Sequence, residues 1–433
     1  MLTYRKILLF WLPLAATWLM MSVEGPFLAA IIARLADPKY NLAAYGVAFA
    51  FALIIEAPVI MIMSASTALV TDRDSFIKMR NFTYFLNALV TTVMLMILIP
   101  SIFFFITENL IGLEAQVSKI THHALILLLP WPGAIGYRRF YQGILIRSNL
   151  TRRVAYGTII RLFSMSGTAL LLYIYFQLDG ALVGAISLSV AVSMEALASR
   201  LMARKSVDAI CSKEMQAPDD RSNLNYQTIL HFYYPLALTS LLGLGVQPMV
   251  TFFMGHSRMA LESLAVFPVV HSLVFIFRGI GLSFQEVGIA LMGKRDENYQ
   301  RLRNFALILG SSLVLLLSII AFTPLSLTWY QQISGLSETL SHLAILPTRI
   351  LAIMPGLTVL LSFQRALLVI HKHNTPITMA TGLEVSMIVA ILFLTTRYLD
   401  MVGIIAAALA LISGRLLANS FLVKPFISVL RKE

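Results

Sequence analysis

Long runs of apolar residues, separated by short polar stretches, recur from one end of the chain to the other. A helix that spans the hydrocarbon core of a bilayer needs about 20 mostly apolar residues. Twelve runs qualify, and several are longer, which predicts tilted or kinked helices. They cover residues 7–33, 42–70, 82–107, 120–146, 154–177, 180–199, 228–254, 261–292, 304–328, 340–370, 376–396 and 402–423. The pattern predicts an all-α polytopic membrane protein of about twelve transmembrane helices.

The two halves of the chain repeat one another at an offset of 222 or 223 positions. The matches pair Phe10–Thr17 with Phe232–Thr239, Pro26 with Pro248, and Pro132-Gly133 with Pro355-Gly356. Each proline removes a helical hydrogen bond and frees a carbonyl group in mid-membrane. Six helices per half give both copies the same orientation, which predicts two parallel six-helix bundles. The longest polar stretch lies between them, so we predict bundles over 1–200 and 228–433 and a cytoplasmic linker over 201–227.

Composition agrees with a membrane protein. The chain is 58% hydrophobic and 12% charged, whereas soluble domains carry roughly 25% charged residues. The net charge of +12 is better explained by loops held against an anionic inner leaflet than by nucleic-acid binding, so no nucleic-acid partner is expected.

The distribution of Lys and Arg predicts the orientation. With the N-terminus in the cytoplasm, 21 basic residues fall in inside segments and 5 in outside segments. Both termini and Cys211, the single cysteine, should then face the cytoplasm of a cell that carries the protein in its inner or plasma membrane. The first apolar run is too long for the core of a cleavable signal peptide.

Twelve ionisable residues lie inside the predicted spans, where such groups are expensive and usually face the interior or a wet cavity. Seven are arginines and five are glutamates: Arg138, Arg139, Arg161, Arg278, Arg349, Arg365, Arg415, Glu24, Glu56, Glu195, Glu286 and Glu384. Arginine stays charged and binds carboxylate or phosphate groups with two parallel hydrogen bonds. The excess of arginine therefore indicates an anionic small-molecule substrate.

Proline-broken helices next to charged residues are typical of transporter binding sites. Arg138 and Arg139 follow such a break, Arg349 lies between two prolines, and Arg278 and Glu286 lie about 40° apart on one helix. We predict a substrate site in a cavity between the halves, near mid-membrane. Its expected residues are Arg138, Arg139, Arg278, Glu286, Arg349 and Arg365.

Two carboxylates precede prolines within predicted helices, namely Glu24 and Glu56. Each could bind a coupling ion, H⁺ or Na⁺, or neutralise an arginine across the cavity. Arg161, Arg415 and Glu195 are better explained as snorkelling or structurally paired groups.

The sequence carries no phosphate-binding glycine loop and no HExxH motif, so an enzyme and a bound cofactor are not expected. The paired histidines His122-His123 and His371-x-His373 lie near membrane ends and are better explained as solvated residues than as metal ligands.

Several short motifs resemble a known superfamily. Both halves open with an aromatic-x-Pro-Leu-Ala-x-Thr helix, and Gln142–Arg147 resembles a segment of the MATE multidrug exporters. Four other segments are similar to the progressive ankylosis (ANK-type) branch of the MATE-like multidrug, oligosaccharidyl-lipid and polysaccharide (MOP) exporter superfamily: Leu42–Ala48, Val70–Asp74, Tyr234–Leu238 and Leu346–Ile350. Animal members carry an acidic tail, which this C-terminus lacks.

The resemblance implies alternating access through a V-shaped central cavity between two bundles. The ANK-type branch implies export of pyrophosphate, nucleotides or organic acids such as citrate. The multidrug branch implies H⁺ or Na⁺ coupling through acidic residues. Its usual helix 1 aspartate has no counterpart in this sequence, where Glu24 is the nearest candidate. Our first hypothesis is a secondary exporter of a small organic or phosphorylated anion. The alternatives are a cation-coupled multidrug exporter, a flippase for a lipid-linked precursor, and a membrane scaffold without transport activity.

Overall fold

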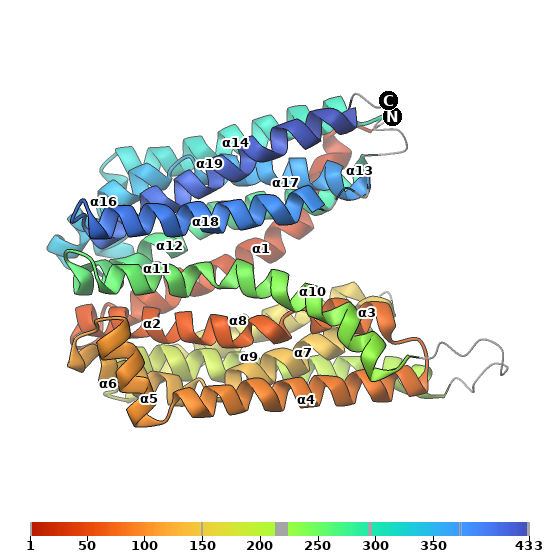
Figure 1. The fold of residues 1–433 in the computed structure, drawn as a ribbon, viewed down its shortest axis with the longest axis horizontal. Coiled ribbons are helices and arrows are strands. Elements are labelled where there is room, and N and C mark those ends of the chain that lie inside the picture. Colours follow the sequence, from red (N-terminus) through yellow and green to blue (C-terminus); the bar gives the residue numbers. More distant parts are fainter. Residues whose placement is uncertain are drawn as a thin grey trace. The chain divides into compact units, whose positions relative to one another are not determined.

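The computed structural model describes residues 2–148, 150–212, 224–292, 297–371, 373 and 375–430. Within these residues the regular structure is helical, and the only β-type pairing is an isolated bridge between Arg258 and Val402 (Figure 1). The helices group into two compact units. Unit 1 comprises Met1–Gly46 and Met249–Glu433, and unit 2 comprises Val47–Pro248.

Ten helices in the described residues are long and apolar enough to cross a membrane, or eleven when the bent pair Arg73–Ile97 and Pro100–Leu110 counts as one span. About twelve were predicted. The remaining predicted span, 120–146, is divided between a helix of 13 residues, Ala115–Leu127, and one of 18 residues, Pro130–Arg147, which contains three arginines. Length and charge therefore keep this stretch from counting as an apolar span. The chain is an integral membrane protein with an all-helical fold.

Unit 2 is built around α7 (Pro130–Arg147), which packs against α3, α4 and α9. The helix that opens the second sequence half, α10 (Tyr226–Leu244), also belongs to this unit and packs against η1, α3 and α4. The other elements are α2 (Pro38–Glu56), which begins in unit 1, η1 (Ala57–Val59), α3 (Ile62–Leu69), α4 (Arg73–Ile97), α5 (Pro100–Phe104), η2 (Phe105–Leu110), α6 (Ala115–Leu127), α8 (Thr151–Tyr175) and α9 (Gly180–Cys211).

Unit 1 is built around α17 (Met354–Ile370), which packs against α12, α13, α14 and α19. The helix that opens the chain, α1 (Tyr4–Ile32), packs against α12, α13 and α14. The other elements are α11 (Val246–Gly255), α12 (Ala260–Leu282), α13 (Phe284–Leu291), α14 (Tyr299–Phe322), α15 (Leu325–Leu327), η4 (Thr328–Ile333), α16 (Glu338–Leu351), α18 (Thr375–Arg397) and α19 (Gly403–Leu430).

The units do not coincide with the two sequence halves 1–200 and 228–433, because the opening helix of each half is exchanged. Helix α1 belongs to the unit that the second half builds, and α10 belongs to the unit that the first half builds. Part of the predicted linker, residues 213–223, lies outside the described residues. The division into two six-helix bundles stays a prediction.

The sequence repeat extends to local backbone structure. The π-helices η2 and η4 begin 223 positions apart, and each is followed by a left-handed glycine, Gly112 (φ 77°) or Gly335 (φ 75°). Glycine adopts this conformation without the steric cost that a Cβ atom adds. The hydropathy pattern contains no signal for either π-turn, and both features occur where an apolar run ends.

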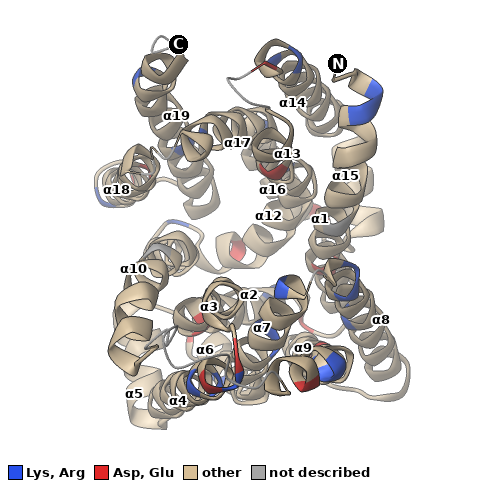
Figure 2. Ribbon diagram, turned by 90° about the vertical axis from the view of Figure 1, so that its right-hand side faces the viewer, with Lys and Arg blue, Asp and Glu red and all other residues tan. Residues whose placement is uncertain are grey.

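The two ends of the chain meet at one end of unit 1. Ile7 of α1 and Val429 of α19 belong to the same buried apolar cluster, and Figure 1 shows the start of α1 beside the end of α19. Figure 2 views the unit from this end and shows basic segments on α1 and α14 there. A chain whose two ends lie on the same side is expected to cross the membrane an even number of times.

Candidate functional site

The core of unit 2 contains a buried ionic network centred on Glu195 of α9. Arg138 of α7 donates to Glu195 Oε2 in a short hydrogen bond, and Gln142 donates to Glu195 Oε1 at 3.1 Å. Arg161 of α8 lies 3.9 Å from the same carboxylate. Arg138 and Glu195 are 4% and 1% exposed, so the pair is shielded from water on all sides. The network joins three helices around one negative charge.

The same network extends to Glu56, the last residue of α2. Trp131 Nε1 donates to Glu56 Oε2 at 2.5 Å, and the Trp131 ring lies 5.9 Å from the Arg161 guanidinium carbon. The charge of Arg139 acts on both Glu56 and Glu195, and its Nη1 donates to Met63 Sδ at 3.7 Å. Because α2 ends at Glu56 and a 3₁₀ turn follows, the carboxylate lies at a helix break, as predicted. Three arginines and two glutamates thus nearly balance one another in unit 2.

Unit 1 contains a second buried cluster, formed by α12, α17, α18 and α19. Arg415 Nε donates to Glu384 Oε1 at 2.9 Å, and both side chains are nearly buried. Arg365 donates to Thr381 Oγ1 at 3.0 Å. The charges of Arg415 and Glu384 act on both Arg278 and Arg365. Four helices therefore bring three arginines and one glutamate together.

The positive charge of the unit 1 cluster is poorly compensated. Within the described part of the chain, Arg278 and Arg365 take part in no ion pair, and the Nε atom of each is buried without a hydrogen-bond partner. A charge taken out of water without a partner costs several kcal/mol even after the protein relaxes. Such groups are kept where they line water or bind an ion of opposite charge. This cluster is accordingly the stronger candidate for an anion site.

The remaining predicted residues lie on α16, α13 and α1. Arg349 is exposed on α16, where its Nε donates to Ala321 O at 3.1 Å and its guanidinium lies over the Phe322 ring at 5.5 Å. Glu286 is exposed on α13. Glu24 is buried on α1, next to Gly25, whose Cα faces Ser272 of α12 so closely that a Cβ would lie 3.0 Å from the serine. Glu24 thus belongs to unit 1, whereas Glu56 belongs to unit 2.

The structure therefore divides the predicted substrate site between the units. Arg138 and Arg139 lie in the network of unit 2, while Arg278 and Arg365 lie in the cluster of unit 1. Glu384 was listed among the intramembrane glutamates, but the sequence analysis gave it no role. It lies 31 residues before Arg415, on the neighbouring transmembrane helix, and this separation does not by itself identify the pair.

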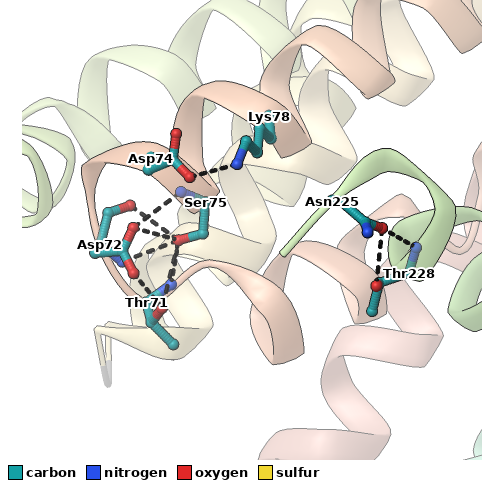
Figure 3. Close-up of polar contacts among 7 residues, drawn as sticks. All are labelled: Thr71, Asp72, Asp74, Ser75, Lys78, Asn225 and Thr228. Atoms are coloured by element: carbon teal, nitrogen blue, oxygen red, sulfur yellow. Dashed lines mark hydrogen bonds and ion pairs between the residues drawn. The ribbon is translucent and has the colours of Figure 1, made fainter. Parts of the chain in front are cut away.

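The loop motif Val70–Asp74 forms a tight helix start. Asp72 caps α4 by accepting from Ser75 N at 2.9 Å, while Ser75 Oγ accepts from Asp72 N at 3.0 Å, and Thr71 Oγ1 donates to Asp72 at 2.8 Å (Figure 3). Such a reciprocal capping box satisfies two otherwise unpaired donors. Burial raises the pKa of the Asp72 carboxyl, but these hydrogen bonds outweigh it, and the pKa lies below its ordinary value. Asn225 caps α10 in a similar way through Thr228.

Within the described ranges, no group of three or more His, Cys, Asp and Glu side chains is placed to hold a metal ion. The histidines predicted to be solvated fall into two classes. His123 and His373 are exposed, whereas His122 is partly buried, with its Nε2 2.9 Å from Leu98 O.

The chain matches no family model and no curated protein, but its fold matches solved transporters over nearly its full length. The inward-facing conformation of a multidrug resistance MATE family transporter of the MOP superfamily superposes with a TM-score of 0.71 at 15% identity, covering 96% of both chains. The lipid II flippase MurJ in an inward closed conformation gives 0.68 at 13% identity, covering 97% of this chain and 90% of the flippase.

A third neighbour is a MOP superfamily transporter from Pyrococcus furiosus, whose binding pocket is described as having reverse polarity. Its TM-score is 0.65 at 16% identity, with 97% of each chain covered. The resemblance to the ANK-type branch stays a prediction. What the likeness establishes is that this chain has the fold of the MATE-type transporters of the MOP superfamily.

Proposed function

We propose that this protein is a secondary transporter that works by alternating access and exports a small organic or phosphorylated anion, of the size and charge of citrate or pyrophosphate. The fold supports the transporter part of the proposal. The substrate class rests on the under-compensated arginines of unit 1, because Arg278 and Arg365 share one buried carboxylate with Arg415. An anion would supply the missing acceptors, and each hydrogen bond to a charged group contributes roughly 1.5–3 kcal/mol.

The two units suggest different roles for their charges. In unit 2 the three arginines of the network lie near Glu195 or Glu56, so the network can remain closed without a ligand. In unit 1 the same number of arginines faces one glutamate. We therefore assign substrate binding to Arg278 and Arg365. Glu24 and Glu56 are retained as the carboxylates that could carry a coupling proton or Na⁺.

The proposal can be tested with the purified full chain in liposomes. Export is measured as counterflow of radiolabelled citrate and of radiolabelled pyrophosphate. Arg278→Gln and Arg365→Gln should each reduce uptake of the transported anion at least tenfold at subsaturating concentration, from the lost charge-assisted hydrogen bonds. Arg397→Gln is the matched control, because Arg397 is an exposed arginine at the end of α18, away from Glu384 on the same helix.

Full counterflow by the Arg278→Gln/Arg365→Gln double variant would show that the arginines are structural. The multidrug alternative predicts another result, which is uptake of a lipophilic cationic dye driven by a pH or Na⁺ gradient with no anion counterflow. That outcome would replace the anion proposal. Loss of gradient-driven transport in Glu56→Gln or Glu24→Gln, with counterflow preserved, would identify the coupling carboxylate.

A further inference from the structure

An arginine with the same local environment occurs at equivalent positions of α4 and α14. Arg80 lies over the ring of Phe76 at 5.9 Å and donates to Asn81 at 3.5 Å. Its counterpart Arg303, 223 positions later, lies over Tyr299 at 6.0 Å and donates to Asn304 at 3.5 Å. In both, the Nε atom is buried with no hydrogen-bond partner among the described residues. In each guanidinium, the Nε–H therefore has no acceptor among the described residues.

In unit 2 this arginine contacts Asn81, which lines a groove of about 480 Å³ between α4 and α10. The groove is lined by Asn81, Phe82, Phe85, Tyr226 and Leu230. Its outer wall is open, because Phe85, Tyr226 and Leu230 are 65%, 51% and 55% exposed. At its base, Phe82 packs edge-on against the Tyr233 ring at 5.2 Å. The groove is thus a mainly apolar slot whose lining includes the side-chain amide of Asn81.

Unit 1 repeats the residues of this slot. On α14, Asn304, Phe305 and Ile308 stand where α4 has Asn81, Phe82 and Phe85. On α1, Tyr4 and Leu8 stand where α10 has Tyr226 and Leu230.

The base of the slot is repeated as well. Phe305 packs edge-on against Trp11 at 5.9 Å, as Phe82 does against Tyr233. Because both halves keep an aromatic base, an exposed tyrosine and an Arg-Asn pair, the arrangement is a built feature of the fold.

The charge around the groove is basic. Lys78 lies one turn before Phe82 on α4 and pairs with the exposed Asp74 at 2.6 Å (Figure 3). Arg80 takes part in no ion pair among the described residues. Arg73 opens the same helix and is exposed. The groove therefore lies near the basic first turns of α4, at the kind of position where a membrane protein meets lipid headgroups. Anionic lipids attract such basic residues, while their chains cover apolar surface.

We propose that the groove between α4 and α10 binds one anionic phospholipid. Its phosphate would accept from Arg80 and Lys78, and the first part of one acyl chain would lie along Phe82, Phe85 and Leu230. A phospholipid fits better than a soluble anion, because most of the wall is apolar and opens outward. Tyr226, the first residue of α10, is an amphipathic side chain of the kind found at the membrane interface.

The test uses the purified full chain in neutral detergent, with dioleoylphosphatidylglycerol, dioleoylphosphatidylcholine and inorganic phosphate as probes. Native mass spectrometry counts retained lipid, and a titration gives its affinity. Wild-type protein should retain phosphatidylglycerol in preference to phosphatidylcholine. Leu230→Trp, which fills the slot and stays apolar, should retain one phosphatidylglycerol fewer. Arg80→Gln should weaken binding at least tenfold, from the lost charge-assisted hydrogen bond.

Matched controls are Leu316→Trp, an equally exposed leucine on α14, and Arg397→Gln, and both should bind as wild type. Lys78→Gln replaces Arg80→Gln if the latter does not purify as a single species, with a smaller loss expected because Lys78 is already paired. Equal retention of both lipids, or unchanged binding in Leu230→Trp, would overturn the proposal. So would displacement of the lipid by millimolar inorganic phosphate, which would indicate a site for a soluble anion instead.

Discussion

Removal of the negative charge at the centre of unit 2 should destabilise that unit strongly. Glu195 accepts hydrogen bonds from Arg138 and Gln142 and lies 3.9 Å from Arg161, so Glu195→Gln leaves three nearby arginines with Glu56 alone. Breaking a buried ion pair by removing one partner costs roughly 3–5 kcal/mol. The glutamine oxygen can still accept one hydrogen bond, so the lower end, about 3 kcal/mol, applies. For a unit of this size, 1 kcal/mol corresponds to about 2–4 °C, which predicts a loss of roughly 6–12 °C.

The assay is the apparent thermal midpoint of the purified protein in detergent, read as the fraction that remains monodisperse after heating. Glu286→Gln is the control, because this glutamate is exposed and takes part in no ion pair within the described part of the chain. In a double-mutant cycle, the Arg138→Met/Glu195→Leu variant should lose less stability than the sum of the losses in Arg138→Met and Glu195→Leu. Directly contacting residues couple by about 0.5–3 kcal/mol. A midpoint within about 2 °C of wild type for Glu195→Gln, or strict additivity in the double variant, would refute the description of this network as a tightly paired core.

Three further predictions concern other parts of the molecule. Arg34→Ala should cost about 1–3 kcal/mol of stability and lower the thermal midpoint, because Arg34 donates to Gln332 O at 2.6 Å and Ile333 O at 2.8 Å at the end of η4. The control Arg258→Ala, which changes another exposed arginine, should leave the midpoint unchanged. Asp72→Ala should cost about 1 kcal/mol as the loss of a helix cap. Because the pKa of Asp72 is lowered in the folded state, its contribution to stability is complete above the unfolded pKa of about 3.9 and is lost as the pH falls through the folded pKa. The thermal midpoints of wild type and Asp72→Ala should therefore differ at pH 7 and converge towards pH 3. Cys211 should react with a membrane-impermeant thiol reagent in permeabilised but not in intact cells, and labelling of intact cells would reverse the predicted orientation.

The hydropathy pattern by itself determined the fold class. A helix in a bilayer satisfies its backbone within its own segment, so its presence depends on local composition and the sequence reveals it directly. The helix break at Glu56 followed in the same way from Pro58, because a proline acts on the backbone of its own turn. The span over 120–146 was predicted like the others, but the arginines that suggested a site there keep it out of the purely apolar class.

Tertiary structure decided the partners of the charges and the membership of the units. Arg138 meets Glu195 from 57 positions away, and Arg415 meets Glu384 from 31, and no local pattern specifies such encounters. The exchange of α1 and α10 between the units was equally hidden, because an apolar helix carries little information about which neighbour it packs against. The sequence thus indicated which residues must avoid lipid. Only the packed helices show that Arg138 and Arg161 of unit 2 lie against Glu195, while Arg278 and Arg365 of unit 1 have no ion pair in the described part of the chain. The physical reason is that pairing depends on distances between helices, which are set only when the chain folds.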